Sequence, residues 1–469
     1  IKYALTLCPV NDNDSYLPKD IRSAQRVTML NFRPQPVSGN SLLNIYRAEF
    51  MRLFQLALPL VLTQLAQMGF SLADTIMAGR VSSVELAGVA LGTVVFWPLM
   101  FLVSGIVLAI TPTVSQLRGA GRLEAGGETV RQAMWIALVG GIVLVVVFRN
   151  LDPIYHLIGV DPEALPVTRA YLLAMSWGVI PALFYYCLRY LCEGSGWTMP
   201  ALLITASALL LKLPLNYWFI YGGYGVPALG GEGCGWATVI ALLYQLLAMA
   251  LVVRFSRLHR AGFYARFSWP DFDTIRRLVV LGVPIGLAIF LEFSLFSSLT
   301  LMIGRLGVEA IAAHQIASNV GALAFMVPYA LGMAASIRVG TNVGAGDLDG
   351  AKVSGWVALA TSLLLALVAA VILVFGRDQI ASWYSTEAAV VALAAQLMIF
   401  VAIYQPFDDV QATAMGVLRG FKDTRRPFLI AVLSYWFVAF PISWTLGFGY
   451  FESLDYGVYG LSLIHISEP

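Results

Sequence analysis

Charged residues are scarce in this chain, since only 12% of its 469 residues are Asp, Glu, Lys or Arg and 59% are hydrophobic. Soluble domains carry about 25% charged and roughly 45–50% apolar residues. Half the usual charge cannot cover a soluble body of this length, and the mean hydropathy of +0.78 agrees. The same composition excludes a disordered chain, a collagen and a coiled coil. The sequence therefore predicts a protein whose main solvent is lipid.

Several chemical signatures are also missing. The four cysteines form no metal-binding spacing and require no disulfide, and a net charge of +2 gives no case for nucleic acid as a partner. The ATP-binding pattern G-x-x-x-x-G-K-[ST], the zinc-protease pattern H-E-x-x-H and the nucleophile elbow G-x-S-x-G do not occur. We therefore expect neither an enzyme nor an ATP-driven machine, and no cofactor.

Long apolar runs fill most of the chain. A spanning helix needs about 20 mostly apolar residues, and eleven such runs alternate with short polar connections. They cover residues 50–72, 84–114, 130–148, 166–190, 200–222, 234–254, 275–301, 309–338, 353–375, 388–418 and 427–449. No connection is long enough to fold as a separate soluble domain. We expect one all-α, polytopic membrane protein.

Basic residues are shared unevenly between these connections. Numbered in chain order, the even-numbered connections hold most of the Arg and Lys, above all the long segment 255–277. Cytoplasmic loops carry the excess of Lys and Arg in membrane proteins. The pattern predicts a cytoplasmic amino terminus.

The chain also repeats itself, at an offset of about 225 residues. The paired segments include residues 56–59 with 281–284, 77–80 with 302–305, and 119–121 with 344–346. We therefore expect two lobes from a tandem repeat, 46–256 with spans one to six and 257–461 with the remaining spans. Halves of like orientation are related by an axis along the membrane normal, and rocking them about a central cavity is how a transporter works.

The two ends of the chain fit neither lobe. Residues 1–45 show no signal-peptide pattern, and we expect a leader or non-native extension there. The sixth span opens at 233–236, and its repeat counterpart is near 457–460, with too little sequence after it to span. We expect the twelfth helix to be missing from this chain and residues 462–469 to be a non-native tail.

Acidic residues inside the apolar runs are the first candidates for function, because such charges cost about 2.5–3.5 kcal/mol each on insertion scales. Glu292 and Asp408 have no basic neighbour in the sequence, and they predict a cation-coupling site that holds Na⁺ or H⁺. Asp409 belongs to the same candidate site, but neighbouring residues on a helix point about 100° apart. We therefore expect Asp409 to face away from the cavity and to support the residues that bind the cation.

The first half offers its own polar positions. Asp74 is a candidate substrate-binding residue, with a structural ion pair to Arg80 as the alternative, and Gln67 lies on the same face two turns earlier. Lys212 is expected either to snorkel or to pair with an acid of another span. Asn216 follows a proline in the same run as Lys212.

Five motifs, in order, carry a family resemblance. They are ADTIMAG at 73–79, PLNYWFIYGGYGVPALGGEGCGWAT at 214–238, AAHQIASN at 312–319, IRVGTNVGAGD at 337–347, and YQPFDDVQ at 404–411 followed by LRGFKDT at 418–424. On these residues the chain resembles multidrug and toxic compound extrusion (MATE) transporters of the NorM-like bacterial branch. The resemblance implies two six-helix lobes in the bacterial inner membrane and export of cationic amphipathic drugs.

The resemblance also implies roles for single residues. Asp74 matches a position of drug or cation handling, and Glu292 and Asp408 match a cation site of the second lobe. Gln315 matches a drug-contacting position, and Asn216 matches a polar position of the first lobe. Two positions depart from the family pattern, namely Lys212, where asparagine is frequent, and Phe325, where some members have a cavity tyrosine.

These observations favour a monomeric, cation-coupled (Na⁺ or H⁺) antiporter that exports cationic organic small molecules across the lipid bilayer. The alternative is a flippase of lipid-linked saccharides. A flippase should line its cavity with several basic residues to hold phosphates. Acids outnumber the single lysine within the spans, and this disfavours the flippase.

Overall fold

The computed structural model describes residues 39–447, apart from 152–162, 224 and 304–307. By their contacts, residues 1–48 and 49–469 form two separate units, and the description below concerns the second unit. The predicted leader up to residue 38, the predicted tail and the predicted absence of a twelfth helix lie outside the described residues.

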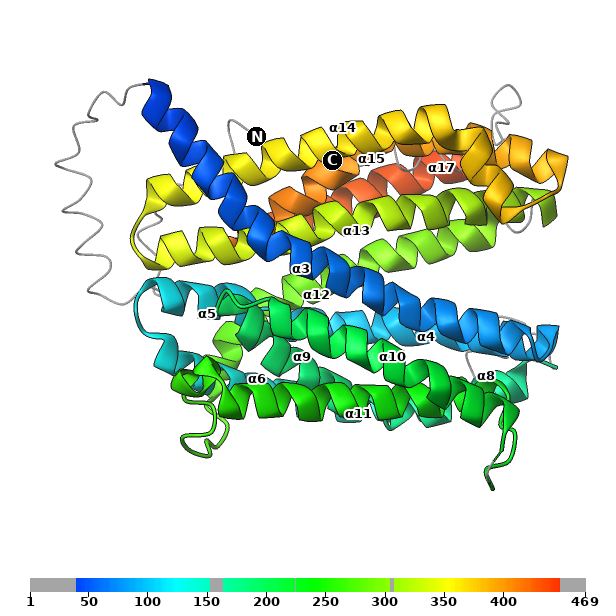
Figure 1. Cartoon of the computed structure of the whole chain (residues 1–469), viewed down its shortest axis with the longest axis horizontal. Coiled ribbons are helices and arrows are strands. Elements are labelled where there is room, and N and C mark those ends of the chain that lie inside the picture. Colours follow the sequence, from blue (N-terminus) through cyan, green and yellow to red (C-terminus); the bar gives the residue numbers. More distant parts are fainter. Residues whose placement is uncertain (1–38, 152–162, 224, 304–307, 448–469) are drawn as a thin grey trace. The chain divides into compact units, whose positions relative to one another are not determined.

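Every regular element in the described part of the chain is helical, as Figure 1 shows. The longer helices, in order, are α3 (Gly39–Gly79), α4 (Ser83–Val107), α5 (Ile110–Gly119), α6 (Gly126–Arg149), α8 (Leu165–Ser176), α9 (Val179–Gly194), α10 (Met199–Tyr221), α11 (Gly231–Phe255), α12 (Phe272–Ile303), α13 (Val308–Gly344), α14 (Leu348–Tyr384), α15 (Ala388–Gly420), α16 (Arg425–Val432) and α17 (Phe440–Gly447). Short helical stretches are η1 (Leu123–Ala125), η2 (Arg257–Ala261) and the π-helical η4 (Leu433–Ala439). The predicted all-α class is confirmed.

The helices have the length and composition of membrane spans. Within the described residues, ten are long and apolar enough to cross a bilayer, and eleven if α8 and α9 count as one span bent by 48°. Their outer faces are apolar, as on α14, where Leu364 is 62% and Phe375 85% exposed. Side chains of this kind on an open face are stable only against lipid.

Two predicted spans contain a break in the helix, although α4 and α5 together still have the length and composition of one span. The run 84–114 is divided into α4 and α5 at residues 108–109, and the run 166–190 into α8 and α9 at residues 177–178. Each break begins four residues before a proline, Pro112 in the first run and Pro181 in the second. A proline ring clashes with the carbonyl four residues earlier and offers no amide hydrogen to it. Proline favours a break at these positions, but Pro59, Pro98 and Pro406 lie inside continuous helices, so a proline alone does not decide where a span breaks.

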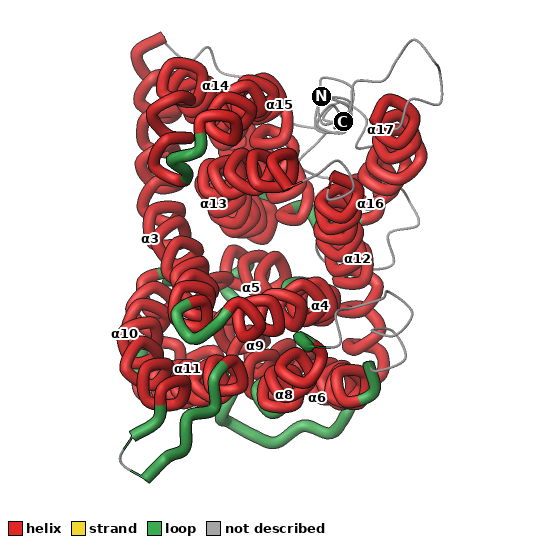
Figure 2. Tube along the Cα trace, turned by 90° about the vertical axis from the view of Figure 1, so that its right-hand side faces the viewer, coloured by secondary structure: helices red, strands yellow, loops and turns green. Residues whose placement is uncertain are grey.

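The helices of the first half, α4 to α11, pack mainly on one another, and α13, α14 and α15 form a second group (Figure 2). Between the groups, α12 packs on α4 and α13 packs on α5. Helix α3 packs against helices of both groups. Leu53, Ala57 and Leu60 join a buried cluster with residues 330–339 of α13, whereas Phe70 packs with Ala208 of α10.

Glycines allow close contact between the two halves. A methyl group added to Gly119 would lie 1.9 Å from the carbonyl oxygen of Thr341, and one added to Gly344 would lie 1.9 Å from the carbonyl oxygen of Gln116. Gly119 and Gln116 are the repeat counterparts of Gly344 and Thr341. The two contacts are therefore equivalents of each other, and the repeat of the sequence is also a repeat of the packing.

Candidate functional site

An open cavity lies among α12, α13, α15 and α16. The residues that line it are Pro284, Ile285, Ala288, Ile289, Glu292, Phe325, Tyr329, Asp408, Gln411, Ala412, Met415, Arg419, Thr424 and Pro427. Most of these side chains are apolar or aromatic, and the few polar ones give the cavity its chemical character.

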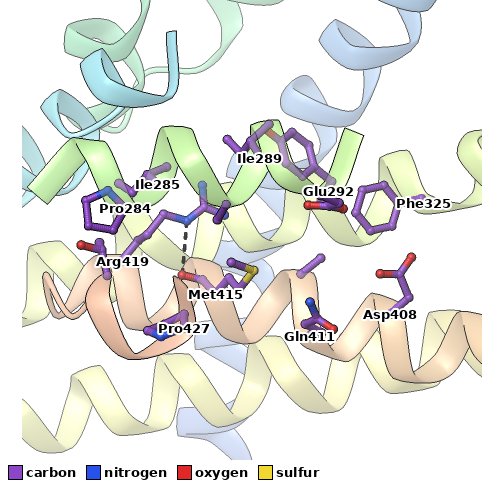
Figure 3. A pocket seen from close by; sticks show the side chains of 14 residues that line it. Pro284, Ile285, Ile289, Glu292, Phe325, Asp408, Gln411, Met415, Arg419 and Pro427 are labelled. Atoms are coloured by element: carbon purple, nitrogen blue, oxygen red, sulfur yellow. Dashed lines mark hydrogen bonds between the residues drawn. The ribbon is translucent and has the colours of Figure 1, made fainter. Parts of the chain in front are cut away.

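Glu292 and Asp408 line this cavity together, from α12 and α15 respectively. They lie toward the same end of it, beside the ring of Phe325 (Figure 3). Asp408 is 7% exposed. Acidic side chains at membrane depth mark ion pathways, and both of these acids border one cavity. That the cavity couples a cation stays a prediction.

A third oxygen group lines the same cavity. The amide nitrogen of Gln411 donates to the hydroxyl of Tyr435 at 2.6 Å. Its amide oxygen is buried and has no hydrogen-bond partner among the described residues. A buried acceptor of this kind is costly unless a ligand uses it. Gln411 thus complements the two carboxylates as an oxygen donor for a cation.

Arg419 adds a positive charge that the sequence analysis counted only in a connection between spans. It lines the cavity near Pro284, at the end opposite Asp408 (Figure 3). Its Nε donates to the backbone oxygen of Met415 at 3.2 Å. Eleven residues of helix separate Arg419 from Asp408, which is about 16 Å along the axis. The cavity therefore has an acidic end and a basic end.

The sequence contained a signal for this lining that we did not use. Asp408, Gln411, Met415 and Arg419 are spaced by three or four residues on α15. This spacing places side chains on one face of a helix. A search along the helix from Asp408 would have found the other three.

Asp409 does not line the cavity. It is 2% exposed, and its Oδ1 accepts a hydrogen bond of 2.6 Å from the amide of Gln405. Its backbone oxygen accepts a second hydrogen bond, from Ser362 at 2.8 Å. The bond from Ser362 joins α14 to α15, whereas Gln405 lies on α15 itself. A supporting role for Asp409 stays a prediction.

Asp74 lies in a separate, buried cluster of the first half. Its Oδ2 accepts a hydrogen bond of 2.7 Å from Lys212, and its Oδ1 accepts one of 2.8 Å from Asn216. The partner considered in the sequence, Arg80, is not the one that the structure supplies. Lys212 pairs with an acid of another span, which was one of its two expected positions. Gln67 lies two turns before Asp74 on α3 and is half-buried.

Gln315 and Phe325 lie on α13, but only Phe325 lines the cavity. The ring of Phe325 faces that of Tyr329 with 5.9 Å between the centroids. Gln315 is exposed, and its amide donates to the side chain of Asn319 at 3.2 Å. Ten residues of helix, about 15 Å, separate Gln315 from Phe325. The two candidate substrate-binding positions are therefore far apart.

A buried ion pair escaped the sequence analysis. Arg189 and Glu193, on α9, are joined at 2.5 Å with side chains 3% and 0% exposed. Arg189 also reaches Gln64 of α3 at 3.4 Å. The two charges stand four residues apart, the spacing of a helical pair, but they fall at or beyond the end of the predicted span 166–190, where charged residues are common.

No group of three or more His, Cys, Asp or Glu side chains in the described ranges could hold a metal ion. The Glu292–Asp408 pair with Gln411 offers oxygen ligands only. Oxygen ligands of low charge suit a monovalent cation or a proton better than a transition metal.

A family model matches this chain. The MatE model covers it twice, over residues 59–218 and 284–445. Both matches begin at a proline, and the internal repeat pairs these two prolines.

Named relatives are similar over most of their length. The multidrug resistance protein PmpM of Pseudomonas aeruginosa is 41% identical over 403 residues, 86% of this chain and 84% of the relative. The multidrug resistance protein MdtK of Yersinia pseudotuberculosis is 41% identical over 404 residues, 86% of this chain and 88% of the relative.

Solved structures share the fold at lower identity. The eukaryotic MATE transporter AtDTX14 has a TM-score of 0.83 at 19% identity, covering 90% of this chain and 93% of that one. The Vibrio cholerae MATE transporter VcmN in its bent form has a TM-score of 0.79 at 20% identity, covering 91% and 94%.

Proposed function

This chain belongs to the MatE family, whose members are transporters and not enzymes, and we propose that it is a cation-coupled antiporter that exports cationic amphipathic drugs and toxic compounds. The observation that carries the proposal is the cavity shared by Glu292 and Asp408. Multidrug resistance proteins from two bacteria match most of the chain, which supports multidrug extrusion as its activity.

The cavity provides a physical basis for exchange. The carboxylates of Glu292 and Asp408 offer negative charge to a Na⁺ ion or a proton that enters this cavity. An organic cation that binds against the rings of Phe325 and Tyr329, through its charge and its apolar body, competes with that ion. Driving force is adequate, since one charge crossing 100 mV gains about 2.3 kcal/mol.

The flippase alternative is weaker on the same cavity. Among its described lining residues, Arg419 is the one with a fixed positive charge, against two carboxylates. A site for lipid-linked phosphates needs several cations in bidentate or clustered positions. A single guanidinium at one end of an acidic cavity favours an organic cation over a phosphate.

Transport in inverted membrane vesicles tests the proposal. Vesicles that contain the protein should accumulate a fluorescent cationic dye when a Na⁺ gradient or a proton gradient is imposed, and the gradient that drives accumulation identifies the coupling ion. Asp378→Asn is a matched control, because this acid is 78% exposed and outside the cavity. Accumulation that is equal with and without both gradients would exclude ion coupling.

We further propose that the protein acts as a monomer in the bacterial inner membrane with its amino terminus in the cytoplasm. The concentration of basic residues in the connection 255–277 supports this orientation. Reporter fusions at Arg257 and Arg425 should give cytoplasmic signals and one at Pro162 a periplasmic signal. A periplasmic signal at Arg257 would contradict the orientation.

A further inference from the structure

Lys212 is a buried cation of the first half, and its side chain is fully enclosed. Its side chain is 1% exposed. The ammonium nitrogen donates to Oδ2 of Asp74 at 2.7 Å and to the backbone oxygen of Phe70 at 3.1 Å. It also lies 4.9 Å from the centre of the Phe70 ring. A carboxylate, a carbonyl and an aromatic face are groups that a free cation would use.

Both carboxylate oxygens of Asp74 accept a hydrogen bond within this cluster. One carboxylate oxygen is held by Lys212 and the other by Asn216, and Asp74 is 6% exposed. In the cluster of Asp74, Lys212 and Asn216, the ammonium of Lys212 therefore neutralises the charge of Asp74. The amide oxygen of Asn216, which is buried, is the one that has no hydrogen-bond partner among the described residues.

Other titratable groups near Asp74 do not change this balance. They are Tyr171 of α8 and Cys234 of α11, and both are ordinarily uncharged at neutral pH. The second half differs, because Glu292 and Asp408 share an open cavity with the fixed charge of Arg419 at the far end.

We infer that Lys212 is a tethered cation that occupies the acidic site of the first half throughout the transport cycle. Asp74 then exchanges neither a proton nor Na⁺, and the exchangeable cation is confined to the cavity of Glu292 and Asp408. Lys212 is thus a positioning residue that sets the number of coupling ions. This inference rests on the proposed cation-coupled function.

Removal of the tethered charge provides the test. In a parent protein carrying Glu292→Gln and Asp408→Asn, the second-half site is silenced. Lys212→Met then leaves Asp74 without its ammonium, while Lys212→Arg keeps a positive charge. The double change Lys212→Met with Asp74→Asn removes both charges and serves as the matched control.

Two measurements on purified protein in detergent show whether Asp74 binds Na⁺ or carries a proton. Binding of radioactive sodium counts bound Na⁺, and infrared difference spectra over pH detect a protonated carboxyl group. The silenced parent and Lys212→Arg should give neither signal from Asp74. Lys212→Met should gain either one Na⁺ per protein or a protonated carboxyl band, and the double variant should lose that gain.

Two results would overturn the inference. One is a sodium or carboxyl signal in the silenced parent that disappears with Asp74→Asn, which can be measured even if Lys212→Met does not fold. The other is a folded Lys212→Met protein that gains neither signal. Neither measurement requires transport, so failure of dye accumulation in vesicles would overturn the proposed function separately.

Discussion

Replacing Gly344 by alanine should push α13 away from α5. The added methyl group would lie 1.9 Å from the backbone oxygen of Gln116, whereas ordinary contact begins at 3.4 Å. The two helices must therefore yield by about 1.5 Å (3.4 minus 1.9), because a backbone oxygen cannot swing aside as a flexible side chain does. Overpacking of this kind costs about 1–3 kcal/mol.

The overpacking destabilises only the conformation in which α5 and α13 are in contact. We expect the two halves to separate at this contact when they rock to open the cavity to the other side of the membrane. The methyl group penalises the packed arrangement and leaves the separated one unaffected. A difference of about 1–3 kcal/mol shifts an equilibrium between two states by roughly 5–150-fold. We therefore expect Gly344→Ala to populate the separated state.

Distance measurement between spin labels detects that shift. Arg122 and Asp349 are exposed near the ends of α5 and α13 and can be replaced by labelled cysteines. The described native cysteines are all buried, so labels attach at the introduced sites once Cys8 is changed to serine. The distance distribution should gain a longer component in Gly344→Ala.

Two further variants sharpen the experiment. Gly119→Ala should act like Gly344→Ala, and the double variant should add little, because one separation relieves both contacts. Gly376→Ala is the control, since its methyl group would meet only the side chain of Ile380 on the same helix. Unchanged distance distributions in folded Gly119→Ala and Gly344→Ala would refute the reasoning.

Two more predictions concern buried charge. Glu292→Gln and Asp408→Asn should each abolish gradient-driven dye accumulation, while Asp409→Asn, hydrogen-bonded outside the cavity, should reduce it less; wild-type rates in both of the first two variants would remove the coupling site. Arg189→Met should lower the melting temperature in detergent sharply, because breaking a buried pair costs about 3–5 kcal/mol. Adding Glu193→Met should restore much of that loss, and a double variant as unstable as Arg189→Met would contradict this account.

The membrane spans and the two-fold repeat were predictable from the sequence alone. Hydropathy is a sum over the residues of one segment, and insertion into a bilayer depends on that sum. The structure confirmed the all-α class on this basis. The breaks before Pro112 and Pro181 could not have been predicted from the proline clash alone, because Pro59, Pro214 and Pro328 lie inside continuous helices.

The composition of the charged sites was only partly predictable. Glu292 and Asp408 were found because an acid inside an apolar run is conspicuous wherever its helix lies. Gln411 and Arg419 share their helix face, but spacing alone does not say which face borders a cavity. That information comes from the packing of α15 against α12 and α13.

The tertiary structure decided which charged residues form ion pairs with each other. Asp74 and Lys212 are 138 residues apart in the chain, and the sequence offered Arg80 as an equally reasonable partner for Asp74. The sequence by itself determined that each of these residues is a charge within a membrane helix, because hydropathy and periodicity depend on neighbours within a few turns. The pairing depends on the rotation and depth at which α3 and α10 pack, and these are set by side chains along both helices together.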